Sequence, residues 1–132
     1  MAEQIQFDLV SPEQLLLSQA VDGVVVPGTE GEMTILPRHA PLMSTLRAGV
    51  IQVLGANIKT PRYFVFGGFA EVTPAGLVIL AEEAVPLDQI EVSVLDQRIR
   101  DLEEDVADAR DDEARLAAAD KLGHLRQVRT VL

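Results

Sequence analysis

Cysteine and tryptophan are absent from this 132-residue chain, and its aromatic side chains are limited to four Phe and one Tyr. The lack of cysteine excludes disulfides and thiolate chemistry. Apolar residues still make up 48% of the chain, so its core must be built from Val, Leu, Ile and Ala. With two histidines as the remaining soft ligands, no metal site is expected.

Long apolar runs and an excess of basic residues are absent as well. The longest apolar runs, such as LVILA at 77–81, are far shorter than the roughly twenty residues that span a bilayer, so no direct bilayer insertion is expected. The first residues carry no basic side chain, which argues against a secretory signal or a transit peptide. The formal net charge of −10 repels nucleic acid and anionic lipid, so we expect protein partners and no nucleic acid.

Residues 5 to 83 have the pattern of β structure. Their apolar residues alternate or form short runs, and Gly, Pro, Asn or Thr interrupts them about every 8 to 12 residues. The expected strands are 5–10, 15–18, 21–26, 32–36, 50–54, 62–66, 69–73 and 77–82. The sequence TPAG at 73–76 predicts a hairpin turn, and Gly67-Gly68 predicts a tight turn or a bulge. About eight short strands without intervening helices predict an N-terminal antiparallel β-sandwich or flattened barrel over residues 1–86.

Residues 87 to 132 have a helical period instead. Apolar residues recur there mostly at spacings of three and four, in two stripes: Leu87, Ile90, Val94, Ile99, Leu102 and Val106, then Ala118, Leu122, Leu125, Val128 and Leu132. Asp88 and Glu91 have the spacing of a capping box, which predicts the start of the first helix there. Asp111-Asp112 interrupts the stripes and predicts a turn. The sequence therefore predicts a C-terminal antiparallel two-helix hairpin.

This hairpin is rich in charge. Residues 87–132 contain twelve Asp and Glu against seven Lys and Arg, a net charge of −5. Pairs such as Asp96 with Arg100 and Asp111 with Arg115 have the i,i+4 spacing of helix-surface ion pairs. The charged residues are therefore interpreted first as a solvated outer face.

No catalytic set is apparent. The glycine-rich segment 26–32 ends in acids, whereas a phosphate loop ends in Lys followed by Ser or Thr. His39 and His124 have no further ligands to complete a metal site, and Ser11, Ser18, Ser44 and Ser93 have no convincing His and acid context for a hydrolytic triad. We therefore expect no catalytic residue and no cofactor.

Several segments are similar to one known family. They are SPE at 11–13, VVPGTEGE at 25–32, LP at 36–37 and HAPL at 39–42, and the similarity continues through Leu46, GVI at 49–51, GG at 67–68, EV at 71–72 and LAE at 80–82. In this order and at these positions, they resemble the epsilon subunit of bacterial F-type ATP synthase. The resemblance covers essentially the whole chain.

The resemblance implies a non-catalytic central-stalk subunit of the proton-translocating rotor, which couples c-ring rotation through gamma to ATP synthesis. Its sandwich would pack against the gamma subunit and rest on the polar loops of the c ring, at the cytoplasmic face of the bacterial plasma membrane. The implied c-ring contact consists of Glu30, Gly31, Glu32, Arg38 and His39. Arg38 replaces the small residue, usually Gly, that the family has before this histidine.

In some members of the family the hairpin binds ATP through an Ile or Leu, then Asp, two variable residues, Arg and Ala. The matching segment here, IEVSVL at 90–95, fits at its first position only. Loss of the Arg removes a charge-assisted phosphate donor worth about 1.5–3 kcal/mol. A degenerate nucleotide site would use Ile90, Glu91, Arg126 and Arg129, and we expect weak or absent ATP binding.

The hairpin also inhibits ATP hydrolysis in some family members, where it extends along gamma to the catalytic beta and alpha subunits. A net-acidic hairpin is poorly matched to the acidic beta segment that it would meet, so weak inhibition is expected. Two other classes remain open at this point. One is a free-standing ligand-sensing protein whose hairpin folds over a metabolite, and the other, less favoured by the residues, is an enzyme.

Overall fold

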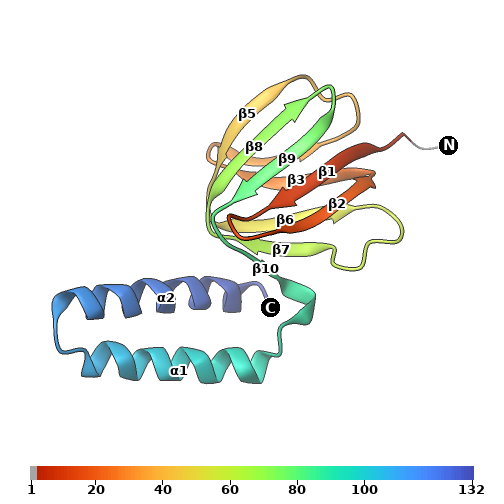
Figure 1. The fold of residues 1–132 in the computed structure, drawn as a ribbon. Helices are drawn as coiled ribbons and strands as arrows, with labels where there is room; N and C mark the ends of the chain where they lie inside the picture. The colour runs from red at the N-terminus through yellow and green to blue at the C-terminus, as the bar shows by residue number, and fades with distance from the viewer. Residues whose placement is uncertain (1–2) are drawn as a thin grey trace. The chain divides into compact units, whose positions relative to one another are not determined.

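The computed structural model describes residues 3–132, which form ten strands followed by a short 3-10 turn and two helices (Figure 1). One compact unit ends at Asp88, and the second is Gln89–Leu132. None of the described helices is long and apolar enough to cross a membrane. The predicted fold class, a β-sandwich followed by two C-terminal helices, is confirmed.

Strands such as Ile5–Val10 and Gly76–Ala81 bury every second side chain, as the alternation of the sequence predicts, whereas Gly23–Gly28 is buried at every position except Val25. Their bounds are β1 (Ile5–Val10), β2 (Leu15–Val21), β3 (Gly23–Gly28), β4 (Gly31–Ile35), β5 (Leu42–Leu46), β6 (Gly49–Leu54), β7 (Arg62–Val65), β8 (Gly68–Thr73), β9 (Gly76–Ala81) and β10 (Ala84–Pro86). Strands β5 and β10 were not expected from the sequence. The predicted hairpin is present, since Thr73 pairs with Gly76 where β8 turns into β9.

The strands pair in the order β10-β7-β6-β3-β5-β8-β9-β1-β2, with β4 paired to β3 beside this path. A single residue pair, Gly28 with Leu46, joins β3 to β5. One layer of the sandwich consists of β10, β7, β6, β3 and β4, and the other consists of β5, β8, β9, β1 and β2. Figure 1 shows the two layers.

The space between the layers is filled by aliphatic side chains, as the composition predicted. Fully buried members include Phe7, Leu9, Ile35, Ile51 and Ile79. No polar or charged side chain among residues 3–132 is buried. The core therefore holds the layers together through apolar burial, at roughly 1.5–3 kcal/mol per large side chain.

One pairing in this sheet differs from the antiparallel sandwich that the sequence predicted. β1 pairs with β9 in parallel, from Phe7 with Leu77 to Val10 with Leu80. Gly67 and Gly68 have φ of +119° and +145°, and they form the bend at which the chain leaves β7 for β8. A left-handed backbone at both positions explains the glycine pair.

The second unit contains α1 (Val92–Asp108) and α2 (Asp112–Thr130), which run antiparallel in Figure 1. Leu95, Leu122 and Val128 are buried. Val94, which the spacing placed on the apolar stripe, is instead 53% exposed. The spacing explains this error, because residues four apart lie on the same face of a helix. Leu95 lies four residues before the half-buried Ile99, whereas Val94 lies five residues before it.

The predicted helix start at Asp88 is also wrong. Residues Leu87–Gln89 form the 3-10 turn η1, and the N-cap of α1 is Glu91, which makes no side-chain capping bond. The Asp88 carboxylate instead accepts a hydrogen bond from the Arg62 guanidinium at 3.3 Å. The ion pair thus takes the carboxylate that the capping box required.

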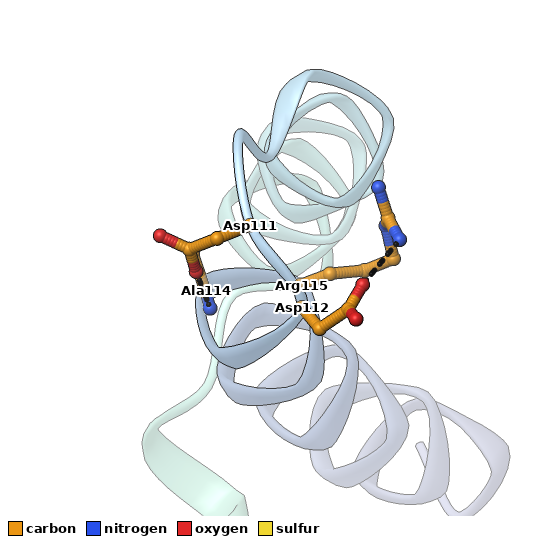
Figure 2. A network of polar contacts seen from close by, with 4 residues as sticks. All are labelled: Asp111, Asp112, Ala114 and Arg115. Atoms are coloured by element: carbon orange, nitrogen blue, oxygen red, sulfur yellow. Dashed lines mark hydrogen bonds and ion pairs between the residues drawn. The ribbon is translucent and has the colours of Figure 1, made fainter.

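The turn between the helices lies where the sequence predicted it. The Asp111 carboxylate is the N-cap of α2 and accepts a hydrogen bond from the backbone N–H of Ala114 at 2.7 Å (Figure 2). Arg115 contacts Asp112 at 3.2 Å rather than the expected Asp111. Because the Asp111 carboxylate caps the helix, Arg115 pairs with the adjacent Asp112.

Candidate functional site

The first group of candidate c-ring contacts lies at the β3–β4 turn. Gly28 pairs with Gly31 across the turn, and Gly31 has φ of +135°, a conformation that favours glycine. Glu30 and Glu32 are exposed, and neither carboxylate has a hydrogen bond or ion pair among the described residues. The turn therefore presents two uncompensated negative charges.

The second group, Arg38 and His39, lies in the connection between β4 and β5. The backbone N–H of His39 donates to the Leu36 carbonyl at 3.1 Å, which closes a tight turn. Within this turn Arg38 has φ of +67°, a left-handed conformation that costs a side-chain-bearing residue about 1–2 kcal/mol. This geometry explains why glycine suits the position, and it leaves the Arg38 side chain 82% exposed beside the Glu3 carboxylate.

The histidine side chain bonds locally. His39 Nδ1 lies 2.8 Å from the Ala40 carbonyl oxygen, so the ring donates through Nδ1–H to its neighbour. The ring itself is exposed. Its Nε2 atom has no hydrogen-bond partner among residues 3–132.

The two groups line different hollows of the surface. Glu30, Gly31 and Glu32 lie in a hollow with Met33 and with Leu42–Thr45. Arg38 and His39 line another with the start of β1 and the β8–β9 turn. The two hollows share no lining residue, so the structure brings together the members of each group but does not place all five residues in one hollow.

The residues of the degenerate nucleotide site lie in the helical unit. Ile90 is half-buried, and Glu91 is the N-cap residue whose backbone carbonyl accepts from the N–H of Leu95 at 3.0 Å. Arg129 Nε donates to the Asp96 carboxylate at 2.8 Å, and the Arg126 guanidinium lies 3.7 Å from Glu103. Both arginines thus contact carboxylates of α1.

The acidic partners of these arginines were missed by sequence reasoning. Asp96 had been paired with Arg100, which instead donates to the Gln97 side chain at 2.8 Å. The antiparallel arrangement of the helices places Arg129, near the end of α2, opposite Asp96, near the start of α1. A long-range pairing of this kind has no signal in local spacing.

Metal-binding groups do not gather in the part of the chain that the structure describes, where no three His, Asp or Glu side chains are suitably placed for one ion. One carboxylate has a shifted pKa. Hydrogen bonds from Ser18 at 2.6 Å and from Gln6 at 3.1 Å lower the pKa of Asp8, on the outward face of β1. This group is hydrogen-bonded as an anion and stays charged at neutral pH.

Comparisons with known proteins agree with this architecture. Residues 4–87 match the family model of the ATP synthase, Delta/Epsilon chain, beta-sandwich domain. The ATP synthase epsilon chain of Parvibaculum lavamentivorans is 54% identical over 129 residues, which cover 98% of both chains. The epsilon chain of Mesorhizobium japonicum is 50% identical over 125 residues, or 95% of this chain and 93% of that one.

Two solved structures share the fold. A chain in the Euglena gracilis mitochondrial ATP synthase, in a structure of OSCP, F1 and the c-ring, superposes with a TM-score of 0.73 at 25% identity and covers 97% of this chain and 81% of that chain. A chain in the central stalk and c-ring of the Tetrahymena thermophila enzyme superposes with a TM-score of 0.62 at 13% identity, over 99% of this chain and 98% of that one. The family expected from the motifs is confirmed, and this chain belongs to the ATP synthase epsilon-chain family.

Proposed function

We propose that this chain is a non-catalytic central-stalk subunit of a proton-translocating F-type ATP synthase, which couples rotation of the c ring through gamma to ATP synthesis. The observation that carries the proposal is the 54% identity to an ATP synthase epsilon chain over 98% of both sequences. A chain in the Euglena complex, which contains F1 and a c-ring, has the same fold over nearly the whole length. The chain contributes binding surfaces and rigidity, and the catalytic groups belong to other subunits.

As part of this assembly, the chain is peripheral at the cytoplasmic face of a bacterial plasma membrane. It touches the c ring through the exposed carboxylates of Glu30 and Glu32, around Gly31, and through Arg38 and His39. The exposure of these side chains and the uncompensated charge of the β3–β4 turn support this assignment. Polar loops of the ring supply the donors that the carboxylates lack.

The assembly proposal is tested with a matched ATPase head that lacks this chain. The purified chain is added, and its co-elution with gamma and the rate of ATP hydrolysis are measured. We expect co-elution that requires gamma, together with a hydrolysis rate that changes less than twofold. A chain that fails to co-elute contradicts the proposed function, and a several-fold loss of hydrolysis contradicts the expectation of weak inhibition by the hairpin.

The c-ring contact is tested by charge reversal in the complete enzyme. Glu32→Lys places a cation on the β3–β4 turn and is expected to lower ATP-driven proton pumping in vesicles while hydrolysis continues. Glu13→Lys, in the exposed β1–β2 connection, is the matched control and is expected to leave pumping unchanged. Equal pumping by both variants would contradict the assignment of this turn to the ring.

ATP binding by the hairpin is expected to be weak or absent. Arg126 and Arg129 already contact Glu103 and Asp96, so a phosphate would have to compete with these carboxylates for the same donors. Titration calorimetry on the isolated chain checks this point. A dissociation constant in the millimolar range or tighter would contradict it.

A further inference from the structure

The second layer of the sandwich ends in an edge strand without charge. Strand β2 is the last in the strand order, and among the described residues it pairs with β1 alone. Its sequence, LLLSQAV, contains no charged residue and no proline. The outward N–H and C=O groups of an edge strand are a template for a further strand, and proteins protect them with charge, with proline or with a covering segment. Because β2 itself has neither charge nor proline, its protection depends on a neighbouring segment.

The core-facing side of β2 is polar at one position. In the pairing with β1, the buried Phe7 is opposite Gln19, and the buried Ile5 is opposite the buried Val21. Residues directly opposite one another lie on the same side of a sheet, so Gln19 is on the core-facing side of the edge. Gln19 is half-buried, and its Nε2 donates to the backbone carbonyl of Asn57 at 3.3 Å. This bond satisfies an amide that would otherwise be costly to place against the core.

Asn57 belongs to the connection between β6 and β7, residues 55–61 (Figure 1). The connection starts beside β2, since the N–H of Asp22, directly after β2, donates to the carbonyl of Leu54 at 2.8 Å. Further along, the half-buried Ile58 packs against the core of the sandwich. A backbone hydrogen bond, a side-chain hydrogen bond and an apolar contact thus attach this segment to the sandwich.

Two further properties suit the segment to cover an edge. Asn57 has φ of +63°, a left-handed conformation that asparagine adopts more readily than most residues with a side chain. Lys59, two residues later, is exposed and supplies the positive charge that β2 lacks. A lysine beside an edge opposes pairing, because an added strand would take its charge out of water.

We propose that residues 55–61, which we call the strap, cover the edge of β2 and prevent it from pairing with β2 of a second copy of this chain. A second copy is the occupant that the strap excludes, because two identical strands can pair antiparallel about a two-fold axis. The uncharged sequence of β2 places no like charges opposite each other in such a pair, although the whole chain has a net charge of −10. The inference concerns the free chain and is independent of the proposed function.

The test measures the oligomeric state of the full chain by sedimentation velocity over a wide range of concentrations. Ile58→Ser removes the apolar contact of the strap, and Gln19→Ala removes the hydrogen bond to Asn57. Both variants are expected to dimerise, with an association constant raised about tenfold or more over that of the unsubstituted chain. Gln52→Ala, at an exposed position of β6, is the matched control and is expected to leave the chain monomeric.

A lysine placed on the edge identifies the interface. Ala20 is exposed on β2, and Ala20→Lys introduces a charge of the kind that protects edge strands. Added to Ile58→Ser or to Gln19→Ala, it is expected to restore the monomer. In the dimers, the amides of residues 15–21 are expected to exchange more slowly than in the monomer, because the added strand binds them.

Three results would each overturn the proposal. Ile58→Ser and Gln19→Ala variants that stay monomeric would show that the strap does not prevent pairing. Dimers that persist with Ala20→Lys would place the interface elsewhere, and dimerisation of the unsubstituted chain through residues 15–21 would show that the edge is open. Circular dichroism verifies that each variant is folded, and Gln19→Ala, a change at a half-buried position, keeps the test valid if Ile58→Ser unfolds.

Discussion

The ion pair between Arg129 and Asp96 is expected to hold the helical hairpin closed. Its two charged atoms are 2.8 Å apart, and the side chains are 41% and 37% exposed. Fully exposed pairs contribute about 0.2–1 kcal/mol, and partial burial places this pair near the upper end, at about 1 kcal/mol. The second pair, Arg126 with Glu103, is longer at 3.7 Å and more exposed, so we expect about 0.3 kcal/mol from it.

The measurement is a double-mutant cycle with Asp96→Asn, Arg129→Gln and the double variant. Hydrogen exchange over residues 92–130 gives the free energy of hairpin opening for each protein. We expect a coupling energy of about 1 kcal/mol at low salt that decreases in 1 M salt, where the Debye length is about 3 Å. Arg115→Gln, at the other end of the hairpin, is the control and should show no coupling to Asp96. A coupling below about 0.2 kcal/mol at low salt would refute the reasoning.

Three further predictions concern the stability of the two units. Gly76→Ala is expected to destabilise the sandwich by more than about 2 kcal/mol in urea unfolding, because φ is +141° and the new Cβ would overlap the Gln6 carbonyl oxygen. Gly123→Ala, in open space on α2, is expected to stabilise the hairpin by about 0.5–1 kcal/mol in the same measurement, and a loss of stability would contradict this. Ser18→Ala removes the main hydrogen bond to Asp8 and is expected to raise its pKa in an NMR titration. Because the folded-state pKa of Asp8 is lowered, its carboxylate contributes stability that is present above the unfolded-state pKa and is lost as the pH falls through the folded-state pKa. Ser18→Ala should therefore lose less stability on acidification than the unsubstituted chain.

The sequence predicted the fold class because the two signals involved are local. Alternation of apolar residues in the first part and three- and four-residue spacing in the second each depend on neighbours within one turn or strand. β5 was missed because its segment, LMSTL, follows two prolines that indicated a turn, and β10 because it has only three residues. The parallel pairing of β1 with β9 joins residues about seventy positions apart, and no local pattern reports it.

Among the candidate functional residues, too, local features could be predicted from the sequence and long-range contacts could not. Tight turns have sequence signatures, and the left-handed backbone at Arg38 agrees with the glycine that the family usually has at this position. The partners of Asp88, Asp96 and Arg129 could not be predicted, since each lies on another element. The sequence also did not reveal that Phe69, Leu80, Val10 and Leu15 lie side by side across four strands, because this requires the registers of those strands.

The parallel β1–β9 pair also has a consequence for the order in which the chain folds. β1 lies between β9 and β2 in the sheet, so the first strand to be synthesised has one of its neighbours among the last strands of the sandwich. The β1–β2 hairpin can form early from local contacts, but it cannot take its place until β9 has left the ribosome. Until then the outward and inward faces of this hairpin are both in water, and closure of the core waits for residues near 80.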